Sequence, residues 1–555
     1  MPIKSQFPNL DIPQVDLLTY LFRDRKLSDE PLWIKSGERE KNLSLKQALQ
    51  WIKRLGSGLS QLGMEKGDVV LIFTPNHIFV PIAYLGIVGS GCIFSGASPS
   101  CTTQEFKHQL SNSMAKAVFA HPGVLGKALE AGRQIGLPPE RIFQFSDEIN
   151  AIRDGVKDWT SILRSPHQSD SWQWPVMEAP ESRQTVATIN YSSGTTGLPK
   201  GVCVTHSNLI SNLEQSHIMR MVKTEHHAPP KERWIGFLPL YHAYGQLYTI
   251  LMAAKLGNPV YVMAEFVYER FLQTISRYQI TNLQVAPPVL VMLSKRPETA
   301  KYDLSSVKEI RCGGAPLSSE LQDAIQTRFG IPVRQGWGMT EVTCGGILLP
   351  SSSDDVRGTV GKLMPNCEGK LLDDGGREVG YDTPGELFIK GPNVCLGYWR
   401  NDEATRATLC DGWLRTGDVA VYNKDGYFWI VDRKKELIKV NGLQVAPAEL
   451  EATLLENEDI ADAAVVGITL NGAEWPRAYV VLQDQSKGRL QSSDIIDWAA
   501  SRVSKHKRLS GGVVFIDEVP KLASGKIKRK VVREWAKRDA TELKKKGGSQ
   551  IVAKL

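Results

Sequence analysis

YSSGTTGLPKGV, residues 191–202, is the stretch of this 555-residue chain that decides most about its fold. Its three glycines let the backbone approach a phosphate closely, and successive backbone N–H groups can form a nest for an anion. Lys200 adds a positive charge, and further donors are the hydroxyls of Ser192, Ser193, Thr195 and Thr196. The stretch lacks the glycine spacing and the lysine–hydroxyl pair of a Walker A loop. It therefore predicts a phosphate-binding loop of another class.

A strand precedes this loop and a helix follows it in our prediction. QTVATINY (184–191) reads as the strand, and Ser207 can cap the helix that contains NLISNLEQS. The alternative is a glycine-rich surface turn, which does not need so many phosphate donors in so few residues. We expect the strand, the phosphate loop and the helix in this order.

Apolar, β-rich runs alternate with helical patterns through much of the chain. Strands are predicted in 69–75, 92–98, 117–122, 258–263 and 283–288, with helices in 125–136 and 266–278. This alternation indicates an α/β protein with mostly parallel sheets. The most apolar stretch, residues 78–98, is broken by Pro81 and several glycines. We interpret it as a buried helix, loop and strand rather than a membrane span.

The pattern changes at two places further along the chain. Residues 355–430 are rich in glycine and short strands, beginning with GTVGKLM, and predict a β-rich subdomain. After Asp432, helices are expected in 446–458 and 494–503 and strands in 463–470 and 477–484, which suits a separate α+β domain. We therefore expect a large domain over 1–432 that includes the β-subdomain, a hinge in DRKKELIK (432–439), and a small mobile domain over 433–555.

Composition excludes several classes of protein. Hydrophobic residues are 42% and charged residues 23%, which is typical of a globular chain with a large core. The net charge of +7 is too small and too dispersed to indicate nucleic acid, and the basic end at 526–546 reads as a solvated helix face. The eight cysteines form no CxxC or zinc spacing and favour a reduced compartment. The N-terminus shows no secretory signal.

Six further motifs follow the phosphate loop along the sequence. They are FLPLYHAYG (237–245), RCGGAPL (311–317), QGWGMTE (335–341), WLRTGDVA (413–420), VDRKKELIKVNG (431–442) and PKLASGKIKRK (520–530). Together with the loop they resemble the adenylate-forming superfamily of acyl-CoA synthetases, adenylation domains and beetle luciferases. The resemblance covers nearly the whole chain and is strongest to the 4-coumarate–CoA ligase branch. It implies an ATP-dependent acid–CoA ligase that forms an acyl-adenylate and then a thioester, with ATP, Mg²⁺ and coenzyme A.

The resemblance also assigns the nucleotide site. Gly314 and Ala315 would lie beside adenine, the face of Trp337 would stack on it, and the Asp418 carboxylate would accept both ribose hydroxyls. Glu341 would hold Mg²⁺ through oxygen. The full set of nucleotide or CoA positions is Ser192, Ser193, Gly194, Thr195, Thr196, Lys200, Gly314, Ala315, Gln335, Gly336, Trp337, Thr340, Asp418, Arg433, Lys435, Lys439, Gly442 and Lys526.

Catalysis and acid binding are implied in the same way. Lys526 would be the catalytic lysine of adenylation, supported by His242, Thr196 and Glu341, whereas Lys439 and Gln444 would act around the phosphate and in thioester formation. Lys435 occupies the hinge position of the family. The acid pocket would be lined by Tyr244, Tyr248, Gly314, Gly336, Gly345, Gly346 and Leu348. Its small residues suggest room for an aryl-alkyl acid, as in 4-coumarate, or for a medium acyl chain.

Three positions depart from the family pattern. Asn441 and Glu265 stand where relatives often carry lysines near CoA, and Trp337 replaces a common tyrosine. Competing readings are an adenylation enzyme that loads a carrier protein, a luciferase-like oxygenase, and a non-catalytic binding protein on the same fold. Because about 25 residues follow the last motif, we expect no carrier domain there. The final residues Ala553, Lys554 and Leu555 are close to a peroxisomal address, so the import receptor is a candidate partner and the peroxisome a candidate location, with the cytoplasm as the other.

Overall fold

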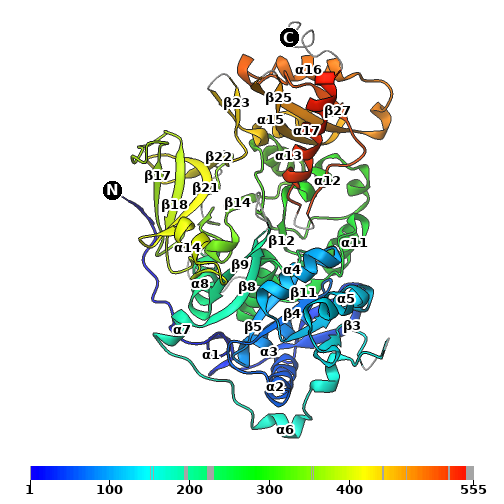
Figure 1. Cartoon of the computed structure of the whole chain (residues 1–555), viewed down its shortest axis with the longest axis vertical. Coiled ribbons are helices and arrows are strands. Elements are labelled where there is room, and N and C mark those ends of the chain that lie inside the picture. The colour runs from blue at the N-terminus through cyan, green and yellow to red at the C-terminus, as the bar shows by residue number, and fades with distance from the viewer. Residues whose placement is uncertain are drawn as a thin grey trace.

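Two parts of unequal size are visible in the computed structural model, the larger at one end and the C-terminal part at the other (Figure 1). The structure describes residues 2–149, 152–153, 155–192, 198–221, 231–351, 353, 356–440, 443–470, 472–522 and 525–545. The larger part contains three sheets, and the C-terminal part contains a fourth sheet together with a two-stranded hairpin.

A seven-stranded sheet contains the first predicted strands. Its order is β19 (Gly397–Tyr398), β9 (Lys200–Thr205), β8 (Val186–Ser192), β5 (Ile93–Ala97), β4 (Val69–Phe73), β6 (Ala117–Ala120) and β7 (Ile142–Gln144). The strands β8, β5, β4, β6 and β7 are parallel, whereas β9 and β19 are antiparallel additions at one edge. All five residues of β4 are buried, as expected for a central parallel strand with neighbours on both sides.

The antiparallel pair β8–β9 flanks the phosphate loop, of which residues 193–197 lie outside the described part. Tyr191 pairs with Gly201 and Ser192 with Lys200, so the two strands stay paired on both sides of the loop residues. Helix α8 (His206–Met221) follows β9 directly. Ser207, which we expected to cap it, is a buried residue inside the helix. Thr205 takes that role, because its hydroxyl accepts from Asn208 N at 3.1 Å while its own N–H donates to Asn208 Oδ1 at 3.0 Å.

A nine-stranded sheet carries most of the pocket described below. Its order is β16 (Lys362–Leu363), β15 (Ile347–Leu348), β14 (Val333–Trp337), β13 (Glu309–Cys312), β12 (Asn282–Val285), β10 (Trp234–Gly236), β11 (Val260–Val262), β2 (Pro31–Lys35) and β3 (Glu38–Ser44). The six strands from β14 to β2 are parallel, and antiparallel strands close both edges. These two sheets confirm the predicted α/β class with mostly parallel strands.

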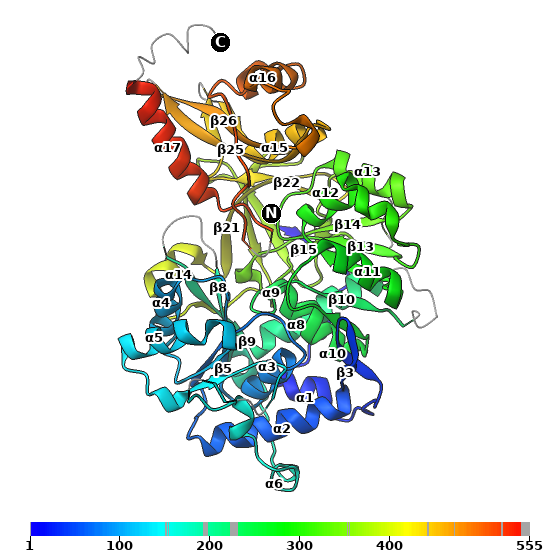
Figure 2. The same ribbon diagram turned by 90° about the vertical axis from the view of Figure 1, so that its right-hand side faces the viewer.

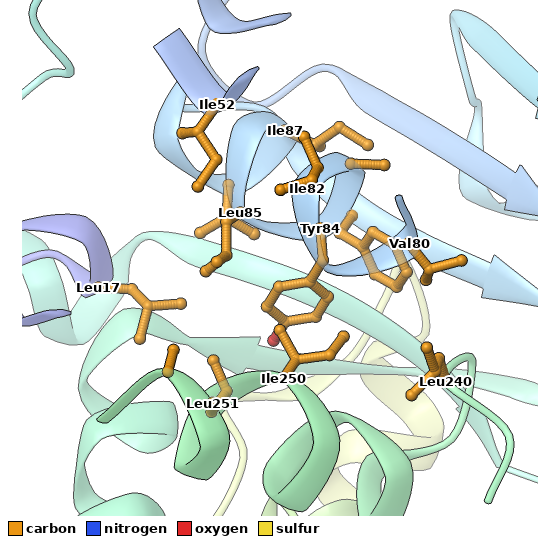
Figure 3. Packing of buried hydrophobic residues seen from close by; sticks show 14 of the residues in the cluster. Leu17, Ile52, Val80, Ile82, Tyr84, Leu85, Ile87, Leu240, Ile250 and Leu251 are labelled. Carbon is orange, nitrogen blue, oxygen red and sulfur yellow. The ribbon is translucent and has the colours of Figure 1, made fainter. Parts of the chain in front are cut away.

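The largest apolar core lies between these sheets and around helix α3 (Val80–Gly89), every residue of which is buried. Figure 3 shows Tyr84 of α3 between Ile250 and Leu251 on one side and Leu85 and Ile52 on the other. Residues 78–98 are therefore an internal helix and strand, as predicted. Among the described residues, no helix combines the length and the hydropathy that crossing a membrane requires.

The β-rich region forms an antiparallel sheet beside these two. It contains β17 (Glu368–Leu372), β18 (Gly385–Lys390), β21 (Trp413–Tyr422), β20 (Leu409–Cys410) and β22 (Phe428–Arg433). Two details differ from the prediction. Strand β1 (Ile3–Lys4), from the far end of the sequence, pairs with β17, and the GTVGKLM segment contributes β16 to the nine-stranded sheet instead. The pairing of β1 with β17 joins residues distant in sequence, which local patterns do not reveal.

The C-terminal part is built on β25 (Ile460–Leu470), β26 (Ala473–Leu482) and β27 (Val513–Phe515). Helices α15 (Pro447–Glu456) and α16 (Ser492–Ala500) pack against one face, and α17 (Arg529–Lys545) covers the other (Figure 2). The basic end that we expected to be a solvated helix is α17, which also buries Val532 and Ala536 against the sheet.

At the junction between the two parts, one charged residue forms ion pairs with the larger part and a nearby one forms an ion pair with the C-terminal part. Lys434 Nζ lies 2.8 Å from Asp374 Oδ1 and 3.0 Å from Glu386 Oε2, both in the β-rich region. Two residues later, Glu436 Oε2 lies 2.6 Å from Arg529 Nε at the start of α17. Arg529 also pairs with Glu451 of α15 at 2.6 Å. Lys435 lies between these two anchored residues with an exposed side chain.

Candidate active site

A pocket of about 890 Å³, including the space at its mouth, lies at the carboxyl ends of β13 and β14. Parallel α/β sheets commonly bind ligands at this edge, because the loops that leave the strands converge there. Gly313 and Gly314 follow β13, Gly336 ends β14, and Tyr244 and Tyr248 form the opposite wall. The C-terminal part closes the pocket with Lys526.

Lys526 is held in the pocket by the loop before α17. Leu522 N donates to Lys526 O at 2.8 Å, and Gly525 has a φ of +83° while it packs against Ala286 and Pro288 of the larger part. Burial and the nearby Arg433 lower the pKa of Lys526, while Asp418 and Glu341 act in the opposite direction. The structure thus brings four of the predicted residues, from both parts of the chain, within electrostatic reach of one another.

Adenylate formation should weaken as pH rises through the lowered pKa of Lys526. The ammonium loses its proton at a lower pH than an ordinary lysine, whose pKa is about 10.4, because burial and Arg433 both disfavour the charge. Pyrophosphate release measured against pH should therefore fall on its alkaline side, and Lys526→Arg should move that fall to higher pH. Thioester formation from supplied acyl-AMP should not follow the same curve. Coincident profiles for the two half-reactions would contradict this assignment.

Asp418 is 4% exposed and lies on β21 opposite Arg433 of β22. Its Oδ2 accepts from Trp337 Nε1 at 2.8 Å, and its Oδ1 lies 3.2 Å from Arg433 Nε. Asp418 is the largest influence on Arg433, whose pKa it raises. We expected Trp337 to offer its face to adenine. The structure adds a contact at the ring edge, where Nε1 donates to Asp418, and the stacking of the face stays a prediction.

Glu341 begins a chain of contacts that leads to the phosphate loop. Its Oε1 accepts from Tyr398 Oη at 2.8 Å, and Lys200 Nζ lies 5.0 Å from the centre of the Tyr398 ring. Tyr398 is held by the pairing of β19 with β9, where it lies opposite Val202. Sequence reasoning missed Tyr398, because the only local signal was its place in the short segment GYW (397–399).

The Glu341 carboxylate and its surroundings fit a magnesium ion that is bound together with phosphates. Glu341 is buried, and its Oε2 has no hydrogen-bond partner among the residues that the structure describes. Mg²⁺ in nucleotide sites uses one or two carboxylates, with phosphate oxygens and waters as the other ligands. No cluster of three or more His, Cys, Asp or Glu side chains with metal-site geometry occurs in the described ranges. One protein carboxylate facing the phosphate loop is therefore consistent with such a site.

Aromatic rings and glycines form the part of the pocket that we predicted to bind the acid. The rings of Tyr244 and Tyr248 meet edge to face at 5.3 Å, and Tyr244 Oη donates to Arg311 O at 3.0 Å. Leu348 lies opposite Gly336, where an added Cβ would be 2.7 Å from Leu348 Cδ1. Burial and Lys526 lower the pKa of His242 to about 4, so this imidazole is neutral at pH 7.

Gly338→Ala should destabilise the protein and disturb this site. A Cβ at residue 338 would lie 1.7 Å from Cys344 O, so the backbone between Trp337 and Thr340 would have to move. We expect a loss of about 1–3 kcal/mol in the free energy of unfolding, as for other overpacked sites. Gly126→Ala is the control, since residue 126 is in α5 (Leu125–Ile135) with open space around its Cβ position. Thermal unfolding of both variants checks this. Equal melting temperatures would contradict it.

Other predicted residues lie outside the pocket. The Gln335 side chain donates to Gln322 Oε1 of α13 (Ser319–Phe329) at 2.8 Å and so points to the opposite face of the sheet. Lys439 and Gln444 face each other across the hairpin of β23 (Ile438–Val440) and β24 (Leu443–Val445), and both are exposed. Glu265 is also exposed, and Ala315 is half-buried beside the pocket. The residues Ser193, Gly194, Thr195, Thr196, Asn441, Gly442, Ala553, Lys554 and Leu555 lie outside the described ranges.

Comparisons with known proteins agree with this geometry. Residues 24–399 match the family described as AMP-binding enzyme, and residues 449–526 match the AMP-binding enzyme C-terminal domain. The chain is 35% identical to a phenylacetyl-CoA ligase of Aspergillus niger, over 96% of this chain and 98% of that protein. It is 33% identical to a probable 4-coumarate–CoA ligase of Dictyostelium discoideum, over 96% and 97%. The crystal structure of an anthranilate CoA ligase with anthranoyl-AMP shares the fold, with a TM-score of 0.85 at 24% identity over 96% and 99% of the chains.

Proposed function

This chain belongs to the AMP-binding enzyme family and is an adenylate-forming acyl-CoA ligase, and from that premise we propose that it activates an aryl-alkyl or medium-chain carboxylic acid. As a member of this family it uses ATP, Mg²⁺ and coenzyme A. The single observation that supports the site assignment best is the position of Lys526, which reaches from the C-terminal part into a pocket shared with His242 and Tyr244.

In the first half-reaction, an oxygen of the acid attacks the α-phosphorus of ATP and pyrophosphate leaves. Two anions must meet, so neutralisation of charge supplies most of the catalysis. We assign this role to the Lys526 ammonium and to the donors of the phosphate loop, including Lys200. Mg²⁺ held at Glu341 would neutralise further phosphate charge. Asp418, oriented by Trp337 and Arg433, would accept from the ribose hydroxyls.

In the second half-reaction, the thiol of coenzyme A attacks the carbonyl carbon of the adenylate and AMP leaves. We propose that the chain divides near residues 432 and 433 and that the C-terminal part turns about Lys435 between the two half-reactions. Such a turn would withdraw Lys526 and present another face of the C-terminal part. Lys439 and Gln444 support this reading, because they are exposed on a hairpin away from the pocket.

A screen of acids for pyrophosphate release, with and without coenzyme A, tests the proposed function. Phenylacetate, 4-coumarate, phenylpropanoate and octanoate cover the aryl-alkyl and medium-chain classes. We expect release with each accepted acid and a thioester product only when coenzyme A is present. Release without any thioester product would instead favour transfer to a carrier protein or a luciferase-like reaction. Absence of release with every acid would contradict the proposal.

We also propose that the protein enters peroxisomes through its last three residues, Ala553, Lys554 and Leu555. This end is a small residue, a basic residue and leucine, which is the chemistry of the SKL-type address read by an import receptor. A fluorescent fusion that keeps this end free should co-localise with a peroxisomal marker, and removal of the three residues should leave it in the cytoplasm. The same distribution with and without the three residues would overturn this proposal.

A further inference from the structure

Two arginines lie side by side at the far end of the acid pocket. Arg311 of β13 pairs with Arg334 of β14, and both line the pocket. Their neighbours Ile310, Cys312 and Val333 pack into the apolar core on the opposite face of the sheet. Because side chains alternate along a strand, both arginines lie on the face of Gly313 and Gly336. Each is two residues before its glycine, or about 7 Å from it along the strand.

Arg311 is 2% exposed and only partly satisfied. Its Nη2 donates to Ser351 Oγ at 2.6 Å, and its Nε lies 2.7 Å from Glu309 Oε1. Its Nη1 has no hydrogen-bond partner among the residues that the structure describes. Burial is the largest single effect and disfavours the charge on Arg311, but Glu309, Tyr248, Glu232 and Tyr244 together outweigh it, and the pKa of Arg311 is raised. A buried guanidinium that stays charged with an unpaired N–H group is costly unless a ligand completes it.

The charges around Arg311 leave an excess of positive charge. Arg334 donates to Ser353 O at 2.9 Å, and Arg220 of α8 pairs with Glu232 at 2.5 Å. Three guanidinium groups therefore face two carboxylates, those of Glu309 and Glu232. These carboxylates and the phenols of Tyr244 and Tyr248 are the acidic groups that act on Arg311. One positive charge remains without an anion in the described part of the chain.

Tyr248 provides a second unused donor at the same end of the pocket. Tyr244 Oη is occupied by Arg311 O, as described above. Tyr248 is buried and lines the pocket, and its hydroxyl makes no hydrogen bond to another described residue. At this end of the apolar pocket, two donors therefore lack a partner among the described residues: Arg311 Nη1 and Tyr248 Oη.

We propose that the preferred acid carries a second anionic oxygen, best a carboxylate, at the end remote from the carboxylate that is activated. Arg311 Nη1 and Tyr248 Oη bind this distal group, while the reacting carboxylate lies beside His242 and Lys526. This inference rests on the proposed function and narrows its substrate to aryl-alkyl or medium-chain acids with a charged far end. A purely apolar acid would fill the apolar part of the pocket and leave Arg311 Nη1 without a hydrogen-bond partner.

Three acids of one shape test this inference on the wild-type enzyme. They are 3-phenylpropanoic acid, 3-(4-hydroxyphenyl)propanoic acid and 3-(4-carboxyphenyl)propanoic acid, and octanoic and octanedioic acids form a linear pair. The measured quantity is kcat/KM for pyrophosphate release and for thioester formation. We expect the 4-carboxy acid to exceed the unsubstituted acid by at least tenfold, with the hydroxy acid between them. If kcat/KM for 3-phenylpropanoic acid and octanoic acid equals or exceeds that for their dicarboxylic counterparts, the inference is overturned. A water molecule then satisfies Arg311 Nη1. Failure of every acid overturns the proposed function instead.

Arg311→Met provides the matched test on the protein side. It should remove the preference, with a loss on the 4-carboxy acid at least tenfold greater than the loss on the unsubstituted acid. Arg311→Met leaves Glu309 as a buried carboxylate without its ion-pair partner, which could unfold the protein. In that case the double variant Glu309→Gln/Arg311→Met is used, because it removes both charges of the pair. Retention of the wild-type preference in the folded variant overturns the role of Arg311.

Discussion

Lys526→Ala is expected to slow acyl-adenylate formation by about 10²–10³-fold, the range found when one preorganised charge or donor is removed from a reacting oxyanion. The structure gives the reason: Lys526 is the residue of the C-terminal part that reaches the pocket, where it lies within electrostatic reach of Glu341, Asp418 and Arg433. No other lysine lines this pocket among the described residues. Without Lys526, no positive charge from the C-terminal part would offset the repulsion between the carboxylate of the acid and the α-phosphate of ATP.

The two half-reactions must be measured separately for this variant. Pyrophosphate release reports adenylation, and thioester formation from supplied acyl-AMP reports the second step, which should stay close to wild type. Lys528→Ala is the matched control, because Lys528 is exposed two residues away in the same loop. Equal losses in both half-reactions, or an equal loss in the control, would show that Lys526 acts by supporting the fold rather than the chemistry.

Asp418→Ala is expected to lower kcat/KM for ATP by about 10²-fold. A hydrogen bond to a charged group contributes about 1.5–3 kcal/mol, and the ribose offers two hydroxyls to this carboxylate. The substitution also leaves Trp337 Nε1 and Arg433 without their shared acceptor. We expect the loss mainly in KM, since the contact is made both before and during the reaction.

Deoxy nucleotides distinguish the loss of the contact between Asp418 and the ribose from general damage to the active site. In the wild type, 2′-deoxy-ATP and 3′-deoxy-ATP should each be poorer substrates than ATP, whereas Asp418→Ala should treat all three alike. Asp425→Ala removes an exposed carboxylate from the turn between β21 and β22 and serves as the control. Continued discrimination between ATP and its deoxy analogues by Asp418→Ala would place the ribose elsewhere.

The parts of this site that could be predicted from sequence are those encoded in short segments. The apolar run at 184–191 identified β8, whereas β9 was not predicted, and the glycines at 314, 336 and 338 do lie at the ends of β13 and β14 or just after them. These features need only a few neighbouring residues to specify a backbone path. Alternation of apolar runs identified the parallel strands for the same reason.

The features that escaped prediction depend on residues far apart in the sequence. The Trp337–Asp418 bond joins residues 81 positions apart, and the Tyr398–Glu341 bond joins residues 57 apart. Arg311 looked like one basic residue before a glycine turn until β13 and β14 placed it beside Arg334. The helix cap moved from Ser207 to Thr205 because β9 extends to Thr205 before α8 begins. Strand pairing or the packing of one sheet against another decided these outcomes, and local patterns contain neither.

The ion pairs on either side of Lys435 have a mechanical consequence. Lys434 is fastened to the β-rich sheet through Asp374 and Glu386, and Glu436 is fastened to α17 through Arg529. If the C-terminal part turns about Lys435, as proposed above, we expect the rotation to fall on the few backbone torsions between these two fastened residues, while the C-terminal sheet and helices move as one body. The hydrogen bonds from Glu436 N and Leu437 N to Arg433 O span the same segment, so we expect the turn to break them.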